Sequence, residues 1–213
     1  MKNSIWVWNL YKKDIKKFNQ YLIDHNITEV ILYWDCFSKV YDELHKLNKN
    51  IGFSVLQGDQ CKKSFIQITK EIDSVLNVYP EKSKVHLDLE YPKGADYKFY
   101  LNTLNKVIDY YNDNEYFIEI ATEVWNLDPR YKKIINKTDE LFLMNYSKTW
   151  WKTILKGIFW YHKPFNQGIE TIKEVSHINL KKEDYNKLNK FSKLFKNYRG
   201  IALHHWGSIK DDL

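Results

Sequence analysis

Cysteine, glycine and proline are scarce in this sequence, and their scarcity excludes several classes of protein. The 213 residues include only two cysteines, Cys36 and Cys61, too few for the disulfide framework of a small secreted domain. Seven glycines and four prolines leave no low-complexity segment or linker that would divide the chain. We therefore expect a single domain over residues 1–213, large enough for a substantial hydrophobic core.

Long apolar runs are also absent. No segment has the ~20 consecutive apolar residues of a membrane-spanning helix. The first residues, Met1-Lys2-Asn3-Ser4-Ile5-Trp6, lack the apolar core of a signal peptide. The sequence therefore predicts a soluble, cytoplasmic protein without a membrane span, and it leaves export by another route open.

Arginine is nearly absent from an otherwise basic chain. The net charge is +6, and all 33 basic residues except Arg130 and Arg199 are lysines, spread along the sequence. A nucleic-acid interface would cluster its positive charge and use arginine for bidentate contacts. We therefore expect no nucleic-acid partner, and the sequence does not indicate an oligomeric state.

What the chain does contain is a regular alternation of short apolar runs and segments with helical spacing. The expected strands are 5–9, 29–35, 51–57, 85–92, 116–124, 140–145, 166–171 and 200–206. The expected helices are 14–25, 40–47, 64–78, 95–111, a short one from 128, 148–161 and 181–197. This order favours an α/β fold, a (β/α)8 TIM barrel with short loops and a missing final helix. A doubly wound open sheet is the alternative, but no GxGxxG or GxxxxGK[ST] motif follows the first strand.

The fourth candidate strand ends in acidic residues. Because side chains alternate along a strand, His86, Asp88 and Glu90 share one face. In a parallel barrel with helices outside, that face points inward, with Glu90 nearest the carboxyl end, where barrel enzymes hold their catalytic groups. Charged groups placed inward are costly unless paired or used, so this strand is a candidate site. The alternative is an ion-paired strand at a sheet edge.

Acidic and aromatic residues also gather at the carboxyl ends of the other strands, which we call the mouth. The residues expected there are Trp8, Asp35, Gln57, Asp59, Asp88, Glu90, Glu123, Trp125, Asn145, Tyr146, Glu170, His204, His205 and Trp206. Aromatic faces stack on sugar rings. Where several carboxylates lie close together, repulsion raises the pKa of one of them, and that group keeps a proton that it can donate as an acid. The mouth therefore suits glycoside hydrolysis.

Several of these residues have a purely structural alternative. Trp8 can belong to the barrel core, Glu123 to an ion pair with a lysine, and Glu170 to a loop if the seventh strand is misplaced. His204 and His205 lie on opposite faces of the last strand, so only one of them can point inward.

Three short motifs resemble the family-18 glycoside hydrolases, the chitinase-like barrels. They are Asp88-Leu89-Glu90 on the fourth strand, Met144-Asn145-Tyr146 on the sixth, and Trp206 on the eighth. The resemblance implies that Glu90 is the general acid and that Asp88 orients a substrate N-acetyl group, which acts as the nucleophile. It further implies that Tyr146 hydrogen-bonds that group and that Trp206 forms the floor of the sugar site. The chain departs from the family at His86, where the family has an aspartate, and at Lys82-Ser83-Lys84, where it has glycines.

The chain is also similar, more loosely, to uncharacterised bacterial barrel proteins with a His-x-Asp-x-Glu-Pro fourth strand. His86 to Glu90, Glu170-Thr171 and His204 fit that pattern, with Tyr91 inserted before the proline. That resemblance implies no established activity, but it suggests a second mechanism in which Glu90 and Glu170 face each other. A carboxyl separation of ~5–5.5 Å would imply a covalent intermediate, and ~6.5–9.5 Å would imply inversion.

The sequence as a whole therefore predicts a glycosidase that hydrolyses an oligo- or polysaccharide. The predicted catalytic residues are Glu90, Asp88, Glu170 and Tyr146, and the predicted sugar-binding residues are Trp206, His204, Glu123, Asn145, Trp8, Asp35 and Trp125. No cofactor or metal is expected. One alternative is a non-catalytic carbohydrate-binding barrel. The other is a metal-dependent hydrolase or phosphodiesterase, in which His86, Asp88 and Glu90 bind a hard divalent ion with Glu119 or His204, although no HxH or HExxH motif supports it.

Overall fold

The computed structural model describes residues 2–58, 62–79, 83–89, 96–123, 129–144, 150–157, 162–170, 187–188 and 190–204. Within these ranges, only the backbone is described for a few residues, among them Glu123, Glu170 and His204. Its strands are β1 (Ser4–Val7), β2 (Glu29–Tyr33), β3 (Gly52–Gln57), β4 (Ser83–Leu89), β5 (Ile118–Glu123), β6 (Glu140–Met144), β7 (Phe165–Glu170) and β8 (Tyr198–His204). Its helices are α1 (Ile15–Asp24), α2 (Trp34–Leu47), α3 (Phe65–Leu76), α4 (Tyr97–Asp113), α5 (Pro129–Asn136) and α6 (Trp150–Gly157), with a 3-10 helix η1 (Lys12–Asp14) before α1.

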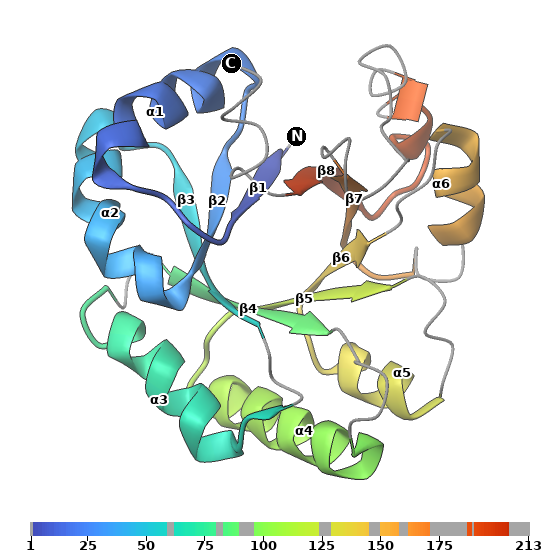
Figure 1. Cartoon of the computed structure of the whole chain (residues 1–213). Coiled ribbons are helices and arrows are strands. Elements are labelled where there is room, and N and C mark those ends of the chain that lie inside the picture. Colours follow the sequence, from blue (N-terminus) through green and yellow to red (C-terminus); the bar gives the residue numbers. More distant parts are fainter. Residues whose placement is uncertain are drawn as a thin grey trace.

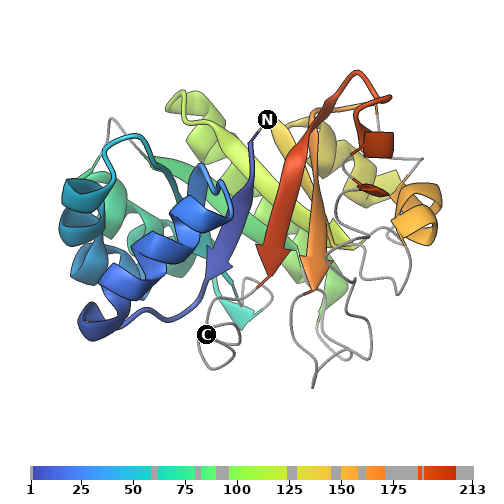
Figure 2. The ribbon, with the colours of Figure 1, turned by 90° about the horizontal axis from the view of Figure 1, so that it is seen from above.

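The eight strands form one closed parallel barrel in sequence order (Figure 1). The closure is made by β1 and β8, where Ser4 pairs with Ala202 and Ile5 with Leu203. Figure 2 shows β1, β8 and β7 side by side and running in the same direction. The predicted (β/α)8 TIM barrel is therefore confirmed, and the open doubly wound sheet is excluded.

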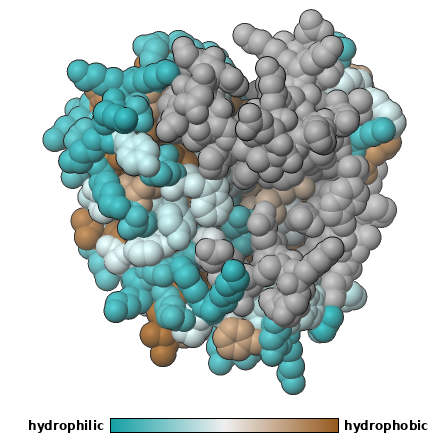
Figure 3. Space-filling model, in the orientation of Figure 1, coloured by the Kyte–Doolittle hydropathy of each residue, from teal (hydrophilic) through white to brown (hydrophobic). Residues whose placement is uncertain are grey.

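The helices surround the barrel because each carries one apolar stripe that covers the outer face of the strands (Figure 1). On α3 the stripe includes Ile68, Ile72 and Val75, all buried. A capping box between Ser64 and Gln67 fixes where this helix begins, because each side chain bonds the other's backbone N–H. The opposite helix faces are polar, and Figure 3 shows mostly hydrophilic side chains over the α1 and α2 side of the molecule.

Two predicted elements differ from the structure. The strand expected over 29–35 ends at Tyr33, and α2 starts at Trp34, well before the predicted residue 40. An acid in the first turn of a helix interacts favourably with the helix dipole, which suits Asp35 to its observed place. Of the helix predicted over 181–197, residues 187–188 and 190–192 are helical, while 181–186 and 189 lie outside the described residues.

No helix in the described part of the chain is both long enough and apolar enough to cross a bilayer.

Candidate active site and the polar interior of the barrel

The lowest layer of the barrel interior, near the amino ends of the strands, is an ion-pair network. The Nζ atom of Lys2 lies 2.6 Å from Glu29, 3.0 Å from Glu119 and 3.2 Å from Glu140. The Nζ atom of Lys84 lies 2.6 Å from Glu29 and 3.0 Å from Glu119. The three carboxylates are between 0% and 7% exposed, so the two lysines supply the countercharge that buried acids require.

Neutral side chains satisfy further carboxylate oxygens of this network. Ser54 Oγ donates to Glu119 Oε2 at 2.8 Å, and Ser4 Oγ donates to Glu29 Oε2 at 2.9 Å. Burial and the neighbouring Glu119 charge raise the pKa of Glu29. Burial opposes ionisation of Glu119 too, but the hydrogen bond from His86 and the charges of Lys2 and Lys84 outweigh it and hold the pKa of Glu119 well below its usual range. Glu119 is therefore a permanent charge inside the barrel at neutral pH.

His86 connects this network to the layer above it. Trp6 Nε1 lies 3.0 Å from His86 Nε2, and an indole nitrogen can only donate, so Nε2 is the acceptor. The other ring nitrogen, Nδ1, therefore carries the proton and donates to Glu119 Oε2 at 3.2 Å. The ring is fully buried, and burial lowers the pKa of His86. His86 is thus a neutral imidazole with both nitrogens in use.

This arrangement bears on the alternative of a metal-dependent hydrolase. His86 has no nitrogen left for a metal, and Glu119 is held by two lysines at the amino end of the barrel. In the ranges that the structure describes, no three histidine, cysteine, aspartate or glutamate side chains form a group that could hold a metal ion. The metal-dependent alternative therefore loses two of its named ligands.

Above the ionic layer, an apolar layer fills the middle of the barrel. Its members are Trp6, Ile31, Leu56, Ala121, Phe142, Met144 and Ala202. Trp6 is only 2% exposed and meets Phe142 edge to face, with ring centres 5.6 Å apart. This layer separates the buried charges below it from the mouth.

Asp88 lies at the mouth end of the same face of β4 as His86. It pairs in register with Ala121, which belongs to the inner apolar layer, so the Asp88 side chain points into the barrel. The residue is half-buried, and its Oδ1 atom is shielded from solvent. The predicted inward face of the fourth strand is therefore confirmed for His86 and Asp88.

Three other predicted residues occupy inward register positions at the mouth, judged from their backbone. Glu123 pairs with Met144, a member of the inner layer. Glu170 and His204 pair with each other, two residues beyond the inward pair Gly168 and Ala202. The seventh strand was therefore placed correctly, and Glu170 lies in it.

Trp8 and Tyr33 form an aromatic pair at the mouth. Trp8 is half-buried, packs against the inner apolar layer, and has its ring centre 5.4 Å from that of Tyr33. The Trp8 ring lies over Gly58, where a Cβ atom would approach it to 2.7 Å. Trp8 therefore contacts the core, as its structural alternative predicts, and its role in sugar binding stays a prediction.

Two residues expected at the mouth have other partners. Gln57 follows the inward Leu56, so its side chain faces outward, where it donates a hydrogen bond to Glu71 of α3. Asp35 is 59% exposed and forms an ion pair with Lys39 at 2.8 Å. The remaining predicted positions, Glu90, Trp125, Asn145, Tyr146 and Trp206, together with Asp59 and His205, lie outside the described residues.

Only a weak signal in the sequence points to the ionic layer. Glu29 and Glu140 each begin a strand, and Glu119 is the second residue of another. A charged residue at a strand start is usually solvent-exposed, and only the register of the closed barrel shows that these three converge.

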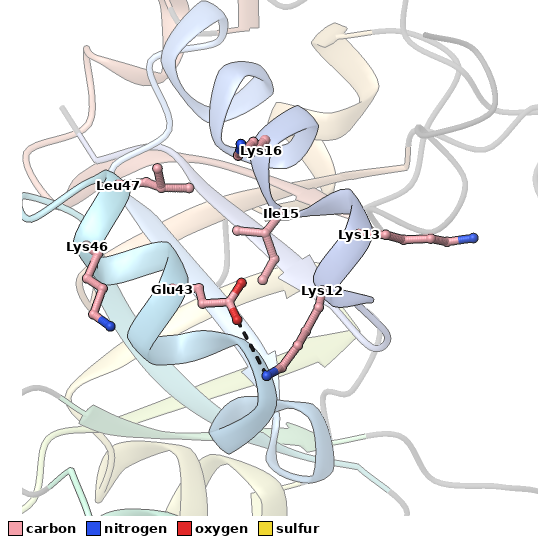
Figure 4. Close-up of a pocket in the computed structure, with 7 residues that line it drawn as sticks. All are labelled: Lys12, Lys13, Ile15, Lys16, Glu43, Lys46 and Leu47. Carbon is pink, nitrogen blue, oxygen red and sulfur yellow. Dashed lines mark ion pairs between the residues drawn. The ribbon is translucent and has the colours of Figure 1, made fainter.

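Two pockets lie between helices on the outside of the barrel. One, of about 480 Å³, is lined by Lys12, Lys13, Ile15, Lys16, Glu43, Lys46 and Leu47 (Figure 4). The other, of about 310 Å³, lies between α2 and α3 and is lined by Trp34, Gln67, Lys70, Glu71 and Ser74. We call the second one the α2–α3 pocket.

The fold is a (β/α)8 barrel with the Asp88 carboxylate and the Trp8–Tyr33 aromatic pair at its mouth. No family model matches the sequence, and no curated protein matches it either. Similar solved structures include the active domain 2 of a chitinase from Pyrococcus furiosus, with a TM-score of 0.70 at 10% identity, covering 95% of this chain and 83% of that one. The GH18 chitinase ChiB of Flavobacterium johnsoniae has a TM-score of 0.64 at 13% identity, covering 97% and 88%. A chitinase-like lectin from tamarind has a TM-score of 0.60 at 10% identity, covering 96% and 94%. At these identities the similarity establishes the fold.

Proposed function

We propose that this protein is a glycoside hydrolase that cleaves an oligo- or polysaccharide at the barrel mouth, with Glu90 as the general acid. The observation that carries the proposal is the position of Asp88, an inward, half-buried carboxylate at the carboxyl end of β4. Catalytic groups of barrel enzymes lie at that end. Glu90 follows Asp88 by two residues, and strand alternation favours the same face for both.

The proposed chemistry requires Glu90 to lie close to Asp88. A carboxylate beside a second carboxyl group raises its pKa, which keeps a proton available near neutral pH. Glu90 would give that proton to the leaving glycosidic oxygen as the bond breaks. The rings of Trp8 and Tyr33, whose centres lie 5.4 Å apart at the same end of the barrel, suit the apolar face of a sugar ring.

The group that stabilises the developing positive charge distinguishes two routes. In one, a substrate N-acetyl group attacks the anomeric carbon while Asp88 and Tyr146 hold it in place. In the other, the Glu170 carboxylate attacks it directly. Hydrolysis confined to N-acetylated oligosaccharides, and retained in Glu170→Gln, supports the first route. Hydrolysis of unacetylated oligosaccharides, lost in Glu170→Gln, supports the second.

The test of the proposal is a Glu90→Gln variant assayed on chitin oligosaccharides and on neutral glucan and xylan oligosaccharides. The amide cannot donate a proton as an acid, so turnover should fall about 100-fold or more while saccharide binding persists. Glu43→Gln, on the exposed surface of α2, is the matched control and should retain full activity. Full activity in Glu90→Gln would disprove the role of Glu90.

A non-catalytic carbohydrate-binding barrel is the second candidate, and one observation favours it. The residue before Asp88 on the inward face is His86, whose nitrogens are both engaged by Trp6 and Glu119. It therefore cannot exchange a proton with Asp88, as a carboxylate at that position could. Tight binding of an oligosaccharide with no product after prolonged incubation would select this candidate.

A further inference from the structure

A line of aromatic side chains leads from the mouth to the outside of the barrel. Trp8 at the end of β1 contacts Tyr33 at the end of β2, with ring centres 5.4 Å apart. Tyr33 in turn contacts Trp34, the first residue of α2, with ring centres 5.9 Å apart. All three residues are half-buried, so each keeps part of its surface at the solvent boundary. Trp34 then forms a wall of the α2–α3 pocket.

The other residues lining that pocket have polar side chains and come from one face of α3, although most of the surface that they and Trp34 present to the pocket is apolar. Gln67 lies three and four residues before Lys70 and Glu71, and Ser74 lies four and three residues after them, which places all four on adjacent turns of one helix face. Glu71 is paired with Lys63 at 2.8 Å, and the Lys63 Nζ atom lies 6.0 Å from the centre of the Trp34 ring. The Lys63–Glu71 pair therefore carries no net charge, and Lys70 is the one further charge among the lining residues.

An indole wall facing amide, hydroxyl and carboxylate groups suits an uncharged, hydroxyl-rich ring. The indole can stack on the apolar face of such a ring, while the Gln67 amide nitrogen and Lys70 Nζ can donate hydrogen bonds to its hydroxyls. The Gln67 Oε1, Ser74 Oγ and Glu71 carboxylate oxygens already have partners within the protein. The larger pocket between α1 and α2 offers no such wall. Its lining has four lysines and no aromatic residue, Lys12 is paired with Glu43 at 3.4 Å, and Lys13 extends away from the pocket (Figure 4).

We propose that the α2–α3 pocket is a remote saccharide-binding subsite, which holds one sugar unit of a chain whose other end occupies the mouth. The inference rests on the proposed function, because it takes the Trp8–Tyr33–Trp34 line as the path of one glycan. The volume of the α2–α3 pocket, about 310 Å³, lies at the lower end of the range for small-ligand pockets. The subsite would increase affinity for long oligosaccharides by adding a contact that short ones cannot reach.

The first experiment observes both ends of the path at once. The tryptophan side chains are labelled with ¹⁵N, and the Nε1–H signals of Trp34 and Trp8 are assigned with Trp34→Phe and Trp8→Phe variants. The hexamer of N-acetylglucosamine is then titrated into the full chain. Movement of both signals supports the subsite. Movement of Trp8 alone overturns the subsite and leaves the proposed function standing, whereas movement of Trp34 alone overturns the mouth as the sugar site. If neither signal moves with this hexamer or with a glucan or xylan hexamer, both proposals fail.

The second experiment compares affinities for the hexamer and the dimer of the same sugar by calorimetry. In the wild-type protein the hexamer should bind about tenfold more tightly, the change that 1.4 kcal/mol produces. Trp34→Ala should remove that advantage. Ser74→Phe should remove that advantage too, because the phenyl ring fills the pocket. This variant keeps the Trp34 indole, so it distinguishes loss of the binding site from misfolding caused by loss of the indole. Trp151→Ala, on the exposed surface of α6, is the control and should keep the wild-type ratio. An unchanged ratio in Ser74→Phe and Trp34→Ala would overturn the subsite.

Discussion

In the centre of the barrel, the His86 ring donates a hydrogen bond from Nδ1 to Glu119 Oε2, 3.2 Å away. The same carboxylate is held by Lys2 and Lys84, each at 3.0 Å. His86 is therefore the upper end of an ionic network that begins at the amino ends of the strands. Above it, Asp88 occupies the next inward position of β4. The interior of the barrel thus combines a structural ion-pair layer with a separate acidic mouth.

The first prediction concerns the pH dependence of stability. Burial lowers the pKa of His86 below the 6.5 of an unfolded histidine. Below pH 6.5 the unfolded chain therefore binds a proton that the folded protein does not bind. The free energy of unfolding should fall as the pH is lowered from 7 to 5, and His86 should contribute up to about 1.4 kcal/mol per pH unit to this loss.

Urea denaturation at pH 7, 6 and 5 measures this effect, with His86→Gln as the diagnostic variant. A glutamine amide can still donate and accept hydrogen bonds but does not titrate, so the variant should lose less stability over the interval. The raised pKa of Glu29 works against this loss, because it stabilises the folded protein as the pH falls. That contribution is present in the wild type and in His86→Gln, so the difference in their stability loss reports on His86. His162→Gln, at an exposed position, is the control. Equal slopes for the wild type and His86→Gln would contradict the prediction.

The second prediction concerns the ionic layer. Replacing Glu119 with alanine leaves Lys2 and Lys84 with one carboxylate fewer and removes the acceptor of Ser54 and His86. Breaking a buried ion pair in this way should cost about 3–5 kcal/mol of unfolding free energy. Glu43→Ala is the comparison, because that side chain is 48% exposed and pairs with Lys12 at 3.4 Å, and it should cost less than about 1 kcal/mol. Similar costs for the two variants in chemical denaturation would show that the layer is not stabilised by its charges.

The third prediction concerns two glycines in strands. A Cβ atom on Gly168 would lie 2.8 Å from the backbone oxygen of Leu143 in the neighbouring strand, which cannot move without disturbing the barrel. Gly168→Ala should therefore destabilise the protein by about 1–3 kcal/mol. A Cβ atom on Gly52 would meet Thr28 at 3.5 Å, an ordinary contact, so Gly52→Ala should change stability little or raise it by up to about 1 kcal/mol. Thermal unfolding of the two variants should show opposite or clearly unequal shifts.

The fourth prediction contrasts the stability contributions of Trp6, in β1, and Trp8, which follows β1. Trp6 is 2% exposed, packs on Phe142 and donates to His86, so Trp6→Ala should cost about 3–5 kcal/mol of stability. Trp8 is half-buried at the mouth, so Trp8→Ala should cost about 1–2 kcal/mol. The proposed function adds that Trp8→Ala weakens oligosaccharide binding. Denaturation and calorimetry on both variants test this contrast, and wild-type saccharide affinity in Trp8→Ala would remove Trp8 from the site.

The sequence predicted the barrel because its local patterns agree with the global fold along nearly the whole chain. All eight strands overlap the ranges expected for them, and the expected inward face of β4 is correct for His86 and Asp88. The strand expected to reach Asp35 ends at Tyr33, and Asp35 lies in the first turn of α2. Gln57 is the last residue of β3, as expected, but its side chain faces α3 and not the mouth, because Leu56 holds the inward position.

The sequence by itself determined the order of strands and helices, because the hydrophobic period changes from helical spacing to a short continuous run at each strand. It also fixed which residues of each strand share a face. Only the tertiary structure decided which faces meet. Glu29, Glu119 and Glu140 converge on Lys2, and Trp34 meets the polar face of α3, through closure of the barrel and the register of neighbouring strands. These contacts join residues far apart in the chain, and no local pattern encodes them.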